Sequence, residues 1–245
     1  MRFSKYNLLL LWETGLRQHP IDRALTILAM VFPELSWDQL TELSIGQRDG
    51  LLFKVREQMF GPLLTGLSGC LGCQEQLEFV IDTTTLDYNH SEKNLEQSRS
   101  VTINVFELIF RLPNSRDLAA IVKSKHLKEA RNLLVKRCVL EARQNEIEIL
   151  AEALPDEVII SLGEKLVECD PLSEVQLNLN CPMCGNCWQV IFDISSYLWT
   201  EISVQAKRLF QEVHILARAY GWSEADILSM STTRRQFYLE MVNSE

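Results

Sequence analysis

The sequence predicts an α+β fold: a small antiparallel β-core with a helical N-terminal section, a helical insertion and long C-terminal helices. Three observations lead to this fold class. Apolar residues recur at helical spacing in the first sixty residues and again near the C-terminus, and short strand-like runs lie between these regions. The 245 residues are 47% apolar and 23% charged, so the chain can bury a core of its own without disulfides.

The first segment, 1–62, is predicted to be helical. Leu25 and Leu28 stand at helical spacing, and Pro33 ends their run because proline cannot continue a helix. A later helix is expected to end at Gly61. Two pairs have the spacing of a capping box, in which side chains satisfy the free amides of a helix start: Ser36 with Gln39, and Ser44 with Gln47.

The β-core is assigned to 63–112 and 172–194. Its strand-like runs, rich in β-branched and aromatic residues or alternating in polarity, are 77–81, 101–110, 174–180 and 188–192. The run at 101–110 reads as a strand or a hairpin. The polar stretch 87–99 is expected to be a loop.

The segment 113–171 is predicted to be a helical insertion. Pro113 makes a turn, after which Asn114 is placed to cap a helix, and Pro155 suits a first helical position. Four residues line one helical face: Leu133, Leu134, Arg137 and Leu140.

The last segment, 195–245, is predicted to contain the longest helix. Its apolar stripe steps alternately by three and four residues, and Gly221 ends it. The stripe consists of Trp199, Ile202, Ala206, Leu209, Val213, Leu216 and Tyr220. Such a stripe is usually core, although this one is long enough to pack against a partner helix as well. Ser223 and Ser231 are placed to start two shorter helices.

The cysteines carry the strongest functional signal. Cys70-x-x-Cys73 and Cys181-x-x-Cys184 each lead into a strand, so the two pairs form a weak internal repeat. A Cys-x-x-Cys turn points both sulfurs to one side, and two such turns complete a tetrahedral shell of four thiolates. The sequence therefore predicts one structural Zn²⁺ site that makes the β-core zinc-ribbon-like.

Other interpretations of the cysteines stay open at this stage. Buried unligated thiols or a redox pair are possible, and a four-thiolate shell also suits a single iron. Cys187 forms a second possible pair with Cys184, but one residue of offset on a strand turns its side chain to the opposite face. We interpret Cys187 as a bystander, and Cys138 and Cys169 as small core residues.

Composition and motifs exclude several functions. The formal net charge of −9 argues against non-specific nucleic-acid binding, which depends on basic residues. No apolar run is long enough to span a bilayer, and no signal-peptide pattern is present, so a reducing cytoplasm is expected. None of the common catalytic or phosphate-binding motifs occurs. We therefore expect no enzyme activity.

Three stretches carry a family resemblance. They are 110–118 (Phe-Arg-Leu-Pro-Asn-Ser-Arg-Asp-Leu), the 181–185 knuckle with Trp188, and 212–222 followed by Arg234-Arg235. These stretches resemble the T-even-type phage baseplate hub assembly proteins, which have relatives in contractile injection systems and phage tail-like particles. The resemblance covers about 45–245 and is most specific in its C-terminal part, while Cys187 and the first 45 residues lie outside the pattern.

The resemblance implies a non-enzymatic structural or assembly protein of a baseplate or hub. It implies that the four paired cysteines are metal ligands and that baseplate or hub proteins are the partners, without nucleic acid or membrane insertion. The protein would act in the cytoplasm or in an assembled tail-like particle. The C-terminal helices become the expected partner surface, through Trp199, Ile202, Leu209, Val213, Leu216, Tyr220 and Trp222. The alternatives are a zinc-ribbon nucleic-acid-binding or transcription accessory protein, or an iron electron-transfer protein.

Overall fold

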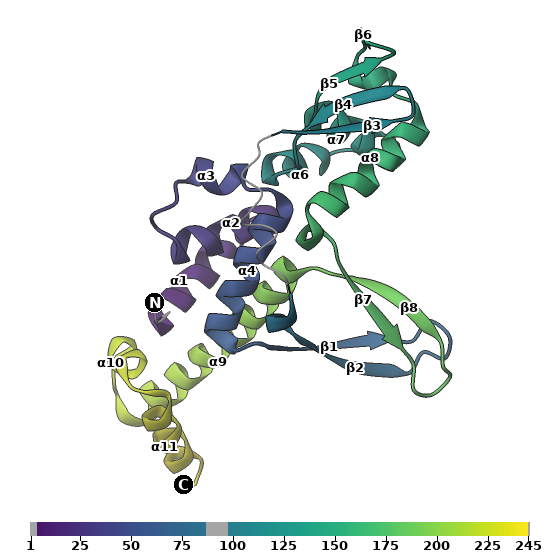
Figure 1. Ribbon diagram of the computed structural model, residues 1–245. Coiled ribbons are helices and arrows are strands. Elements are labelled where there is room, and N and C mark those ends of the chain that lie inside the picture. Colours follow the sequence, from purple (N-terminus) through teal and green to yellow (C-terminus); the bar gives the residue numbers. More distant parts are fainter. Residues whose placement is uncertain (1–3, 87–97, 245) are drawn as a thin grey trace. The chain divides into compact units, whose positions relative to one another are not determined.

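The computed structural model describes residues 4–86 and 98–244, which divide into two compact units (Figure 1). Unit 1 contains residues 4–31 and 195–244, and unit 2 contains the described residues from 32 to 194. Most of the loop expected at 87–99 lies outside the described residues. Within those residues, no helix has both the length and the apolar character needed to cross a bilayer.

Unit 1 is helical and is built from the two ends of the chain. Its helices are α1 (Lys5–Gly15), α2 (Pro20–Val31), α9 (Ile194–Tyr220), α10 (Glu224–Ser229) and α11 (Thr232–Asn243). Leu9 of α1 packs in one apolar cluster with Ala206 and Leu209 of α9 and Leu228 of α10. Residues from opposite ends of the sequence therefore share a core.

The long helix confirms the predicted stripe. Ile202, Ala206, Leu209 and Leu216 are buried. Ala206 and Leu209 pack with residues of α1 and α10, and Leu216 packs with Ile227 and Leu239 of α10 and α11. The helix ends before Gly221, whose φ of 69° is a left-handed conformation that glycine adopts without strain. The short helices begin after the predicted caps Ser223 and Ser231.

The first two helices of unit 2 are α3 (Trp37–Glu42) and α4 (Ile45–Phe60). Both predicted capping boxes are present, with the serine accepting from the N3 amide while the N3 glutamine accepts from the N-cap amide. Gly61 caps the end of α4 with a φ of 91°. The helical prediction for this part of the chain is confirmed.

The central part of unit 2 forms a lobe around a four-stranded antiparallel sheet. Its strands are β3 (Arg99–Ile103), β4 (Phe106–Phe110), β5 (Val139–Gln144) and β6 (Ile147–Glu148), in that order. Its helices are α6 (Ser115–Ile121), α7 (Leu127–Cys138) and α8 (Asp156–Cys169). Phe106, Leu108 and Phe110 of β4 share a core with Val135 of α7 and Leu162 of α8.

The helical prediction for the insertion is wrong over part of its length. Leu140 belongs to strand β5, where its side chain is 53% exposed, and not to a helical face with Leu133. The chain is drawn into the sheet because β5 pairs along β4, for example Leu108 with Ala142. The hairpin β3–β4 therefore joins this sheet and not the strands that flank the cysteines. Pro155 is the residue before α8, one position from the prediction.

Two separate β-ribbons complete unit 2. The first consists of β1 (Leu63–Gly69) and β2 (Gln76–Asp82), and the second of β7 (Val175–Asn180) and β8 (Cys187–Phe192). Three short 3₁₀ helices connect elements: η1 (Thr83–Thr85), η2 (Ala151–Ala153) and η3 (Pro171–Ser173). Helices with small antiparallel sheets confirm the α+β class. The division into four segments at 62, 112, 171 and 194 stays a prediction.

Candidate metal centre

Each ribbon ends in a Cys-x-x-Cys turn, which we call a knuckle (70–75 and 181–186), and the two knuckles have the same hydrogen bonds. The amide of the first cysteine donates to the carbonyl five residues later, and its carbonyl accepts from the amide four residues later. These bonds are Cys70 to Glu75 (2.8 Å) and Gln74 to Cys70 (2.9 Å) in the first knuckle, and Cys181 to Asn186 and Gly185 to Cys181 (both 2.9 Å) in the second. The internal repeat seen in the sequence is therefore a structural repeat.

The fourth position after the first cysteine is left-handed in both knuckles. Gly185 has a φ of 72° and Gln74 a φ of 63°. Glycine takes this conformation freely, whereas a residue with a Cβ pays about 1–2 kcal/mol for it. In the first knuckle, Gln74 thus adopts an unfavourable backbone conformation to complete the turn that directs both sulfurs to one side.

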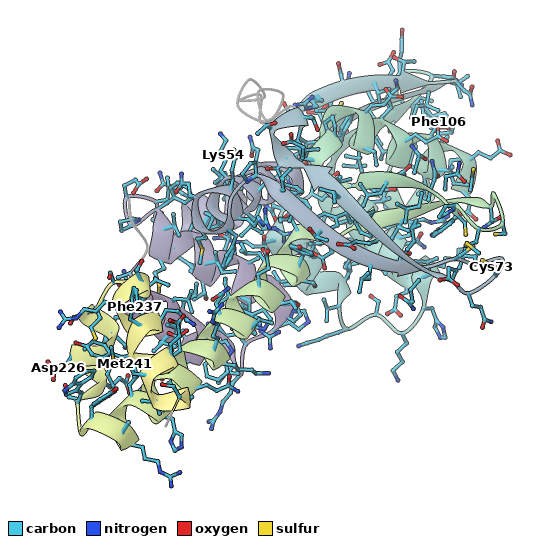
Figure 2. All side chains as sticks on the ribbon, turned by 90° about the horizontal axis from the view of Figure 1, so that it is seen from below. Lys54, Cys73, Phe106, Asp226, Phe237 and Met241 are labelled. Carbon is cyan, nitrogen blue, oxygen red and sulfur yellow. The ribbon has the colours of Figure 1, made fainter. Side chains whose placement is uncertain are left out.

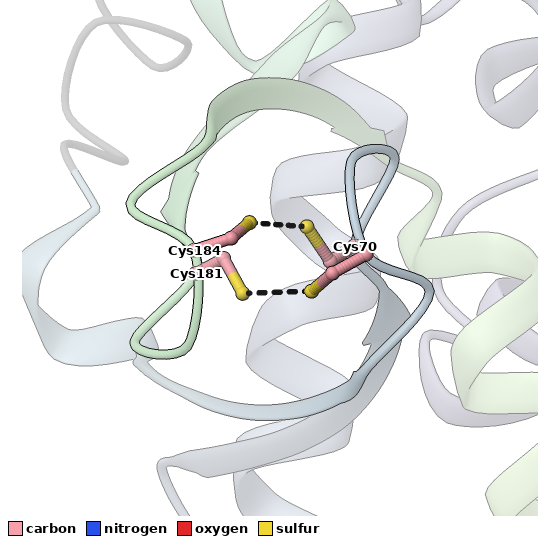
Figure 3. A group of neighbouring side chains, drawn as sticks. Cys70, Cys181 and Cys184 are labelled. Carbon is pink, nitrogen blue, oxygen red and sulfur yellow. Dashed lines mark hydrogen bonds between the residues drawn. The ribbon is translucent and has the colours of Figure 1, made fainter.

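The two knuckles bring four thiols together (Figure 3). The Sγ atoms of Cys70 and Cys184 are 3.6 Å apart, as are those of Cys73 and Cys181, and all four Sγ atoms lie within 4.8 Å of one another. A tetrahedral shell with zinc–sulfur bonds of about 2.3 Å has sulfur–sulfur edges of about 3.8 Å, whereas a disulfide bond is about 2.05 Å. The spacing fits a shared metal ion and not a disulfide.

The electrostatics of the group also fit a cation. Hydrogen bonds from the amides of Cys73 and Gly72 lower the pKa of Cys70 to about 6, the latter over 3.3 Å. The amide of Glu75 lowers the pKa of Cys73, but the neighbouring thiols outweigh it and raise that pKa to about 12. Four thiolates this close repel one another, and a divalent ion at their centre would offset that repulsion.

Burial differs within each pair, and Cys187 is not among the four clustered thiols. Cys70 and Cys181 are buried, while Cys73 and Cys184 are exposed. Cys187 is the first residue of β8, is exposed, and directs its Sγ to the carbonyl of Gly185 at 3.7 Å. Its role as a bystander stays a prediction.

The other two cysteines lie away from the four-thiol group. Cys138 is fully buried in the lobe, as expected of a small core residue, and Cys169 is half-buried against the same core. Burial raises the pKa of the Cys138 thiol to about 12.

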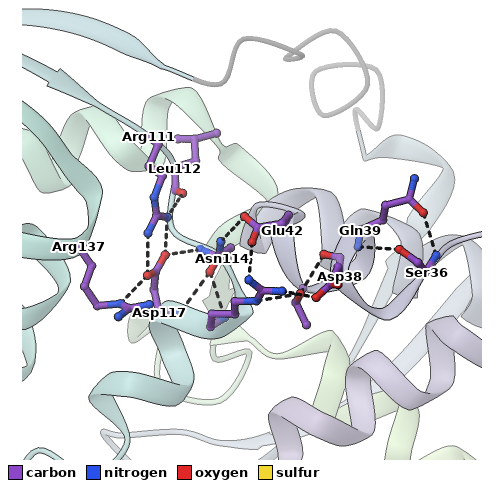
Figure 4. Close-up of polar contacts among 11 residues, drawn as sticks. Ser36, Asp38, Gln39, Glu42, Arg111, Leu112, Asn114, Asp117 and Arg137 are labelled. Atoms are coloured by element: carbon purple, nitrogen blue, oxygen red, sulfur yellow. Dashed lines mark hydrogen bonds and ion pairs between the residues drawn. The ribbon is translucent and has the colours of Figure 1, made fainter.

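A second polar centre, which the sequence did not reveal, lies around Asp117 in α6 (Figure 4). Arg111 donates to both carboxylate oxygens of Asp117, at 2.6 and 2.9 Å, and Arg137 donates to one of them at 2.7 Å. The amide of Asn114 donates to the same carboxylate at 3.0 Å, which completes a capping box. Arg111, Asn114 and Asp117 all come from the stretch 110–118 that carries the family resemblance.

The Asp117 cluster is a structural element of the lobe. The Asp117 side chain is fully buried, and burial alone would raise its pKa, but the donors of Arg111, Asn114 and Arg137 lower it overall. Arg116, next to it, forms ion pairs with Asp38 and Glu42 of the α3 region. The cluster therefore fixes α6 against β4, α7 and α3.

The first amides of α4 form hydrogen bonds with residues at both ends of the segment 113–171. The amide of Ile45 donates to the carbonyl of Pro113 at 3.0 Å, and the amide of Gly46 donates to the buried carboxylate of Asp170 at 2.8 Å. A carboxylate is favourable at a helix N-terminus. A Cβ on Gly46 would lie 2.1 Å from Asp170 Oδ1, so only glycine permits this contact.

The residues expected to bind a partner lie in unit 1, and most of them are at least partly buried there. Ile202, Leu209 and Leu216 are buried, and Val213 is half-buried against the clusters that contain Leu209 and Leu216. The ring of Trp199 lies against Gly15, where a Cβ would be 2.4 Å away.

The C-terminal end of this predicted surface remains accessible. Tyr220 is 38% exposed and stacks on Trp222 with ring centroids 4.5 Å apart. The partner-binding role of the whole set stays a prediction.

A comparison with protein families matches residues 4–199 to the model of the T4 bacteriophage base plate protein. The chain belongs to this family. The match corrects the expected extent of the resemblance, because it includes the first 45 residues of this baseplate-family protein and ends at 199. The stretch 212–222, expected to be the most specific, lies beyond it. Comparisons with curated proteins and with solved structures find no match.

Proposed function

We propose that this protein is a non-enzymatic structural or assembly component of the baseplate or hub of a contractile injection system or phage tail. The observation that carries this proposal is the family match over residues 4–199. The protein would act together with other baseplate or hub proteins, in the cytoplasm during assembly or in the assembled particle.

We further propose that Cys70, Cys73, Cys181 and Cys184 hold one structural Zn²⁺. The four-thiol donor set and the 3.6 Å sulfur spacing support a closed shell, the arrangement typical of structural zinc. Its contribution would be to cross-link the two ribbons, because structural zinc adds its binding free energy to folding. The two knuckles would orient the four sulfur atoms toward the ion.

Metal analysis tests the site directly. We expect the purified, colourless protein to contain one equivalent of zinc, and Cys181→Ser to lose it while Cys187→Ser keeps it. A red protein containing iron would overturn the choice of metal. Equal loss of zinc in both variants would overturn the ligand set.

Reconstitution tests the function. The full chain would be mixed, one by one, with purified sheath, tube and hub proteins of a contractile tail, and the mixtures separated by size. Co-elution with at least one of them is expected. A chain that stays monomeric and binds none of these proteins would overturn the proposal.

A further inference from the structure

The two ribbons and their knuckles, residues 63–82 and 175–192, form what we call the arm. Figure 1 shows both ribbons extending from the helices of unit 2 and converging at their knuckle ends, and Cys73 lies at the far end of the ribbons in Figure 2. Among the described residues, each ribbon strand pairs only with its own partner strand. The tip of the arm is thus held by the four-thiol group and is open to solvent around it.

The arm has an unusual charge composition. Neither stretch contains lysine, arginine or histidine, although about one residue in nine along the chain is one of these three. Its only charged residues are Glu75, Glu78 and Asp82. A divalent ion bound by four thiolates would add a further formal charge of about −2 at the tip. The arm is therefore acidic and contains no cation of its own.

The arm also exposes large apolar side chains. Leu71 in the first knuckle is 77% exposed and Met183 in the second is 72% exposed. The knuckles meet directly, with a Cβ on Gly72 lying 3.4 Å from Asn186 and Cys70 lying 3.6 Å from Cys184, so both apolar side chains are at the tip. Further apolar side chains follow on the strands, namely Leu67 (72%), Val80 (61%) and Ile191 (64%). Clustered exposed apolar residues mark interaction surfaces.

We infer that the tip of the arm docks into an apolar socket, bordered by lysine or arginine, on another baseplate protein. This inference rests on the proposed function. Leu71 and Met183 would enter the socket, and Glu75 and Glu78 with the thiolates would face its basic border, because complementary charge steers and orients a docking surface. Methionine suits such a contact because its side chain adapts to the partner.

Two other occupants fit the arm less well. Nucleic acid is disfavoured because the arm has no cation to bind phosphate. A second copy of the chain would place two acidic arms against each other in a two-fold symmetric pair, and like charges at an interface are unfavourable. A basic partner protein is the occupant that the charges favour.

The experiment compares two double variants and one single variant of the full chain with the wild type. Leu71→Ser with Met183→Ser removes the apolar tip, and Glu75→Lys with Glu78→Lys reverses its charge. Ile147→Ser in β6 is the matched control, because Ile147 is equally exposed at 70% but lies on the four-stranded sheet. The zinc content and circular dichroism of each variant would show that the fold is kept. Affinity for each purified baseplate protein is measured at low and high salt.

We expect the tip variant to bind its partner roughly tenfold or more weakly, as at an interface hot spot. We expect the charge-reversed variant to bind more weakly too and to lose its salt dependence, while Ile147→Ser stays within about twofold. If wild type and tip variant bind the same proteins equally well, the arm inference fails and the proposed function stands. If the wild type binds none, both fail. Self-association or oligonucleotide binding that the tip variant abolishes would also overturn the inference.

Discussion

Removing the cross-link between the ribbons should destabilise unit 2 by a predictable amount. The perturbation is Cys70→Ser with Cys181→Ser, which removes the buried ligand of each pair and leaves the exposed ones. Serine keeps the shape of the side chain, so packing changes little. The variant tests the contribution of the metal, and not that of the local core.

The magnitude follows from how far apart the linked residues are in the sequence. The two close sulfur pairs join residues separated by 114 and by 108 positions. Bringing the ends of a loop of this length together costs an unfolded chain about 5 kcal/mol, so its thiols bind zinc more weakly than the preformed group by about that amount. We therefore expect the double variant to lose about 5 kcal/mol in the free energy of unfolding.

The assay is urea unfolding, followed by circular dichroism and by bound zinc on the same samples. Cys187→Ser is the control, because an exposed residue outside the four-thiol group should change stability by no more than about 0.5 kcal/mol. A chelator added to wild type should reproduce the double variant. If the double variant unfolds at the wild-type urea concentration, or if Cys187→Ser loses as much stability, the cross-link reasoning is refuted.

Three further predictions concern backbone and charge. Asp117→Asn should cost about 3 kcal/mol, because it leaves two guanidinium groups without their carboxylate. Since the folded pKa of Asp117 is lowered, its contribution should be present above pH about 4 and lost as pH falls through that folded pKa, and acid titration of the two proteins should show it. Gly46→Ala should lower the free energy of unfolding by about 2 kcal/mol, because it breaks the charged hydrogen bond at the start of α4. Gly163→Ala is the control: a Cβ there meets nothing within 4 Å, so this variant should gain about 1 kcal/mol. Urea unfolding measures both, and equal effects would contradict the close contact at Gly46. Gly185→Ala should lower the free energy of unfolding by about 1 kcal/mol, because it places a Cβ at a positive φ, whereas Gln74→Gly removes one and should not destabilise the protein. If only Gln74→Gly lowered the stability, the left-handed turn would be contradicted.

Features encoded by nearby residues were predictable from the sequence. Both capping boxes, the helix end at Gly61 and the ribbon at 174–192 depend on residues a few positions apart, so their patterns are visible locally. The grouping of the four cysteines was also predictable, because two Cys-x-x-Cys pairs that each lead into a strand are typical of a shared four-thiolate site.

Features that depend on distant partners were missed. Val139–Gln144 carries apolar residues at a spacing that continues the preceding helix, and only pairing with β4 makes it a strand. The turn after it uses Asn145 and Glu146 with positive φ and contains no glycine, so it gave no hairpin signal. The Asp117 cluster needs Arg137, twenty positions later, which no local motif indicates.

The construction of unit 1 from both chain ends has a consequence for biosynthesis. At about 5–20 residues per second, a ribosome makes Leu209 about 10–40 seconds after Leu9, although the two share one apolar cluster. The face of α1 that packs on α9 therefore stays uncovered on the nascent chain until α9 has been synthesised. A prematurely terminated chain would keep that face exposed, so truncated products should be recognised by chaperones and proteases as unfinished.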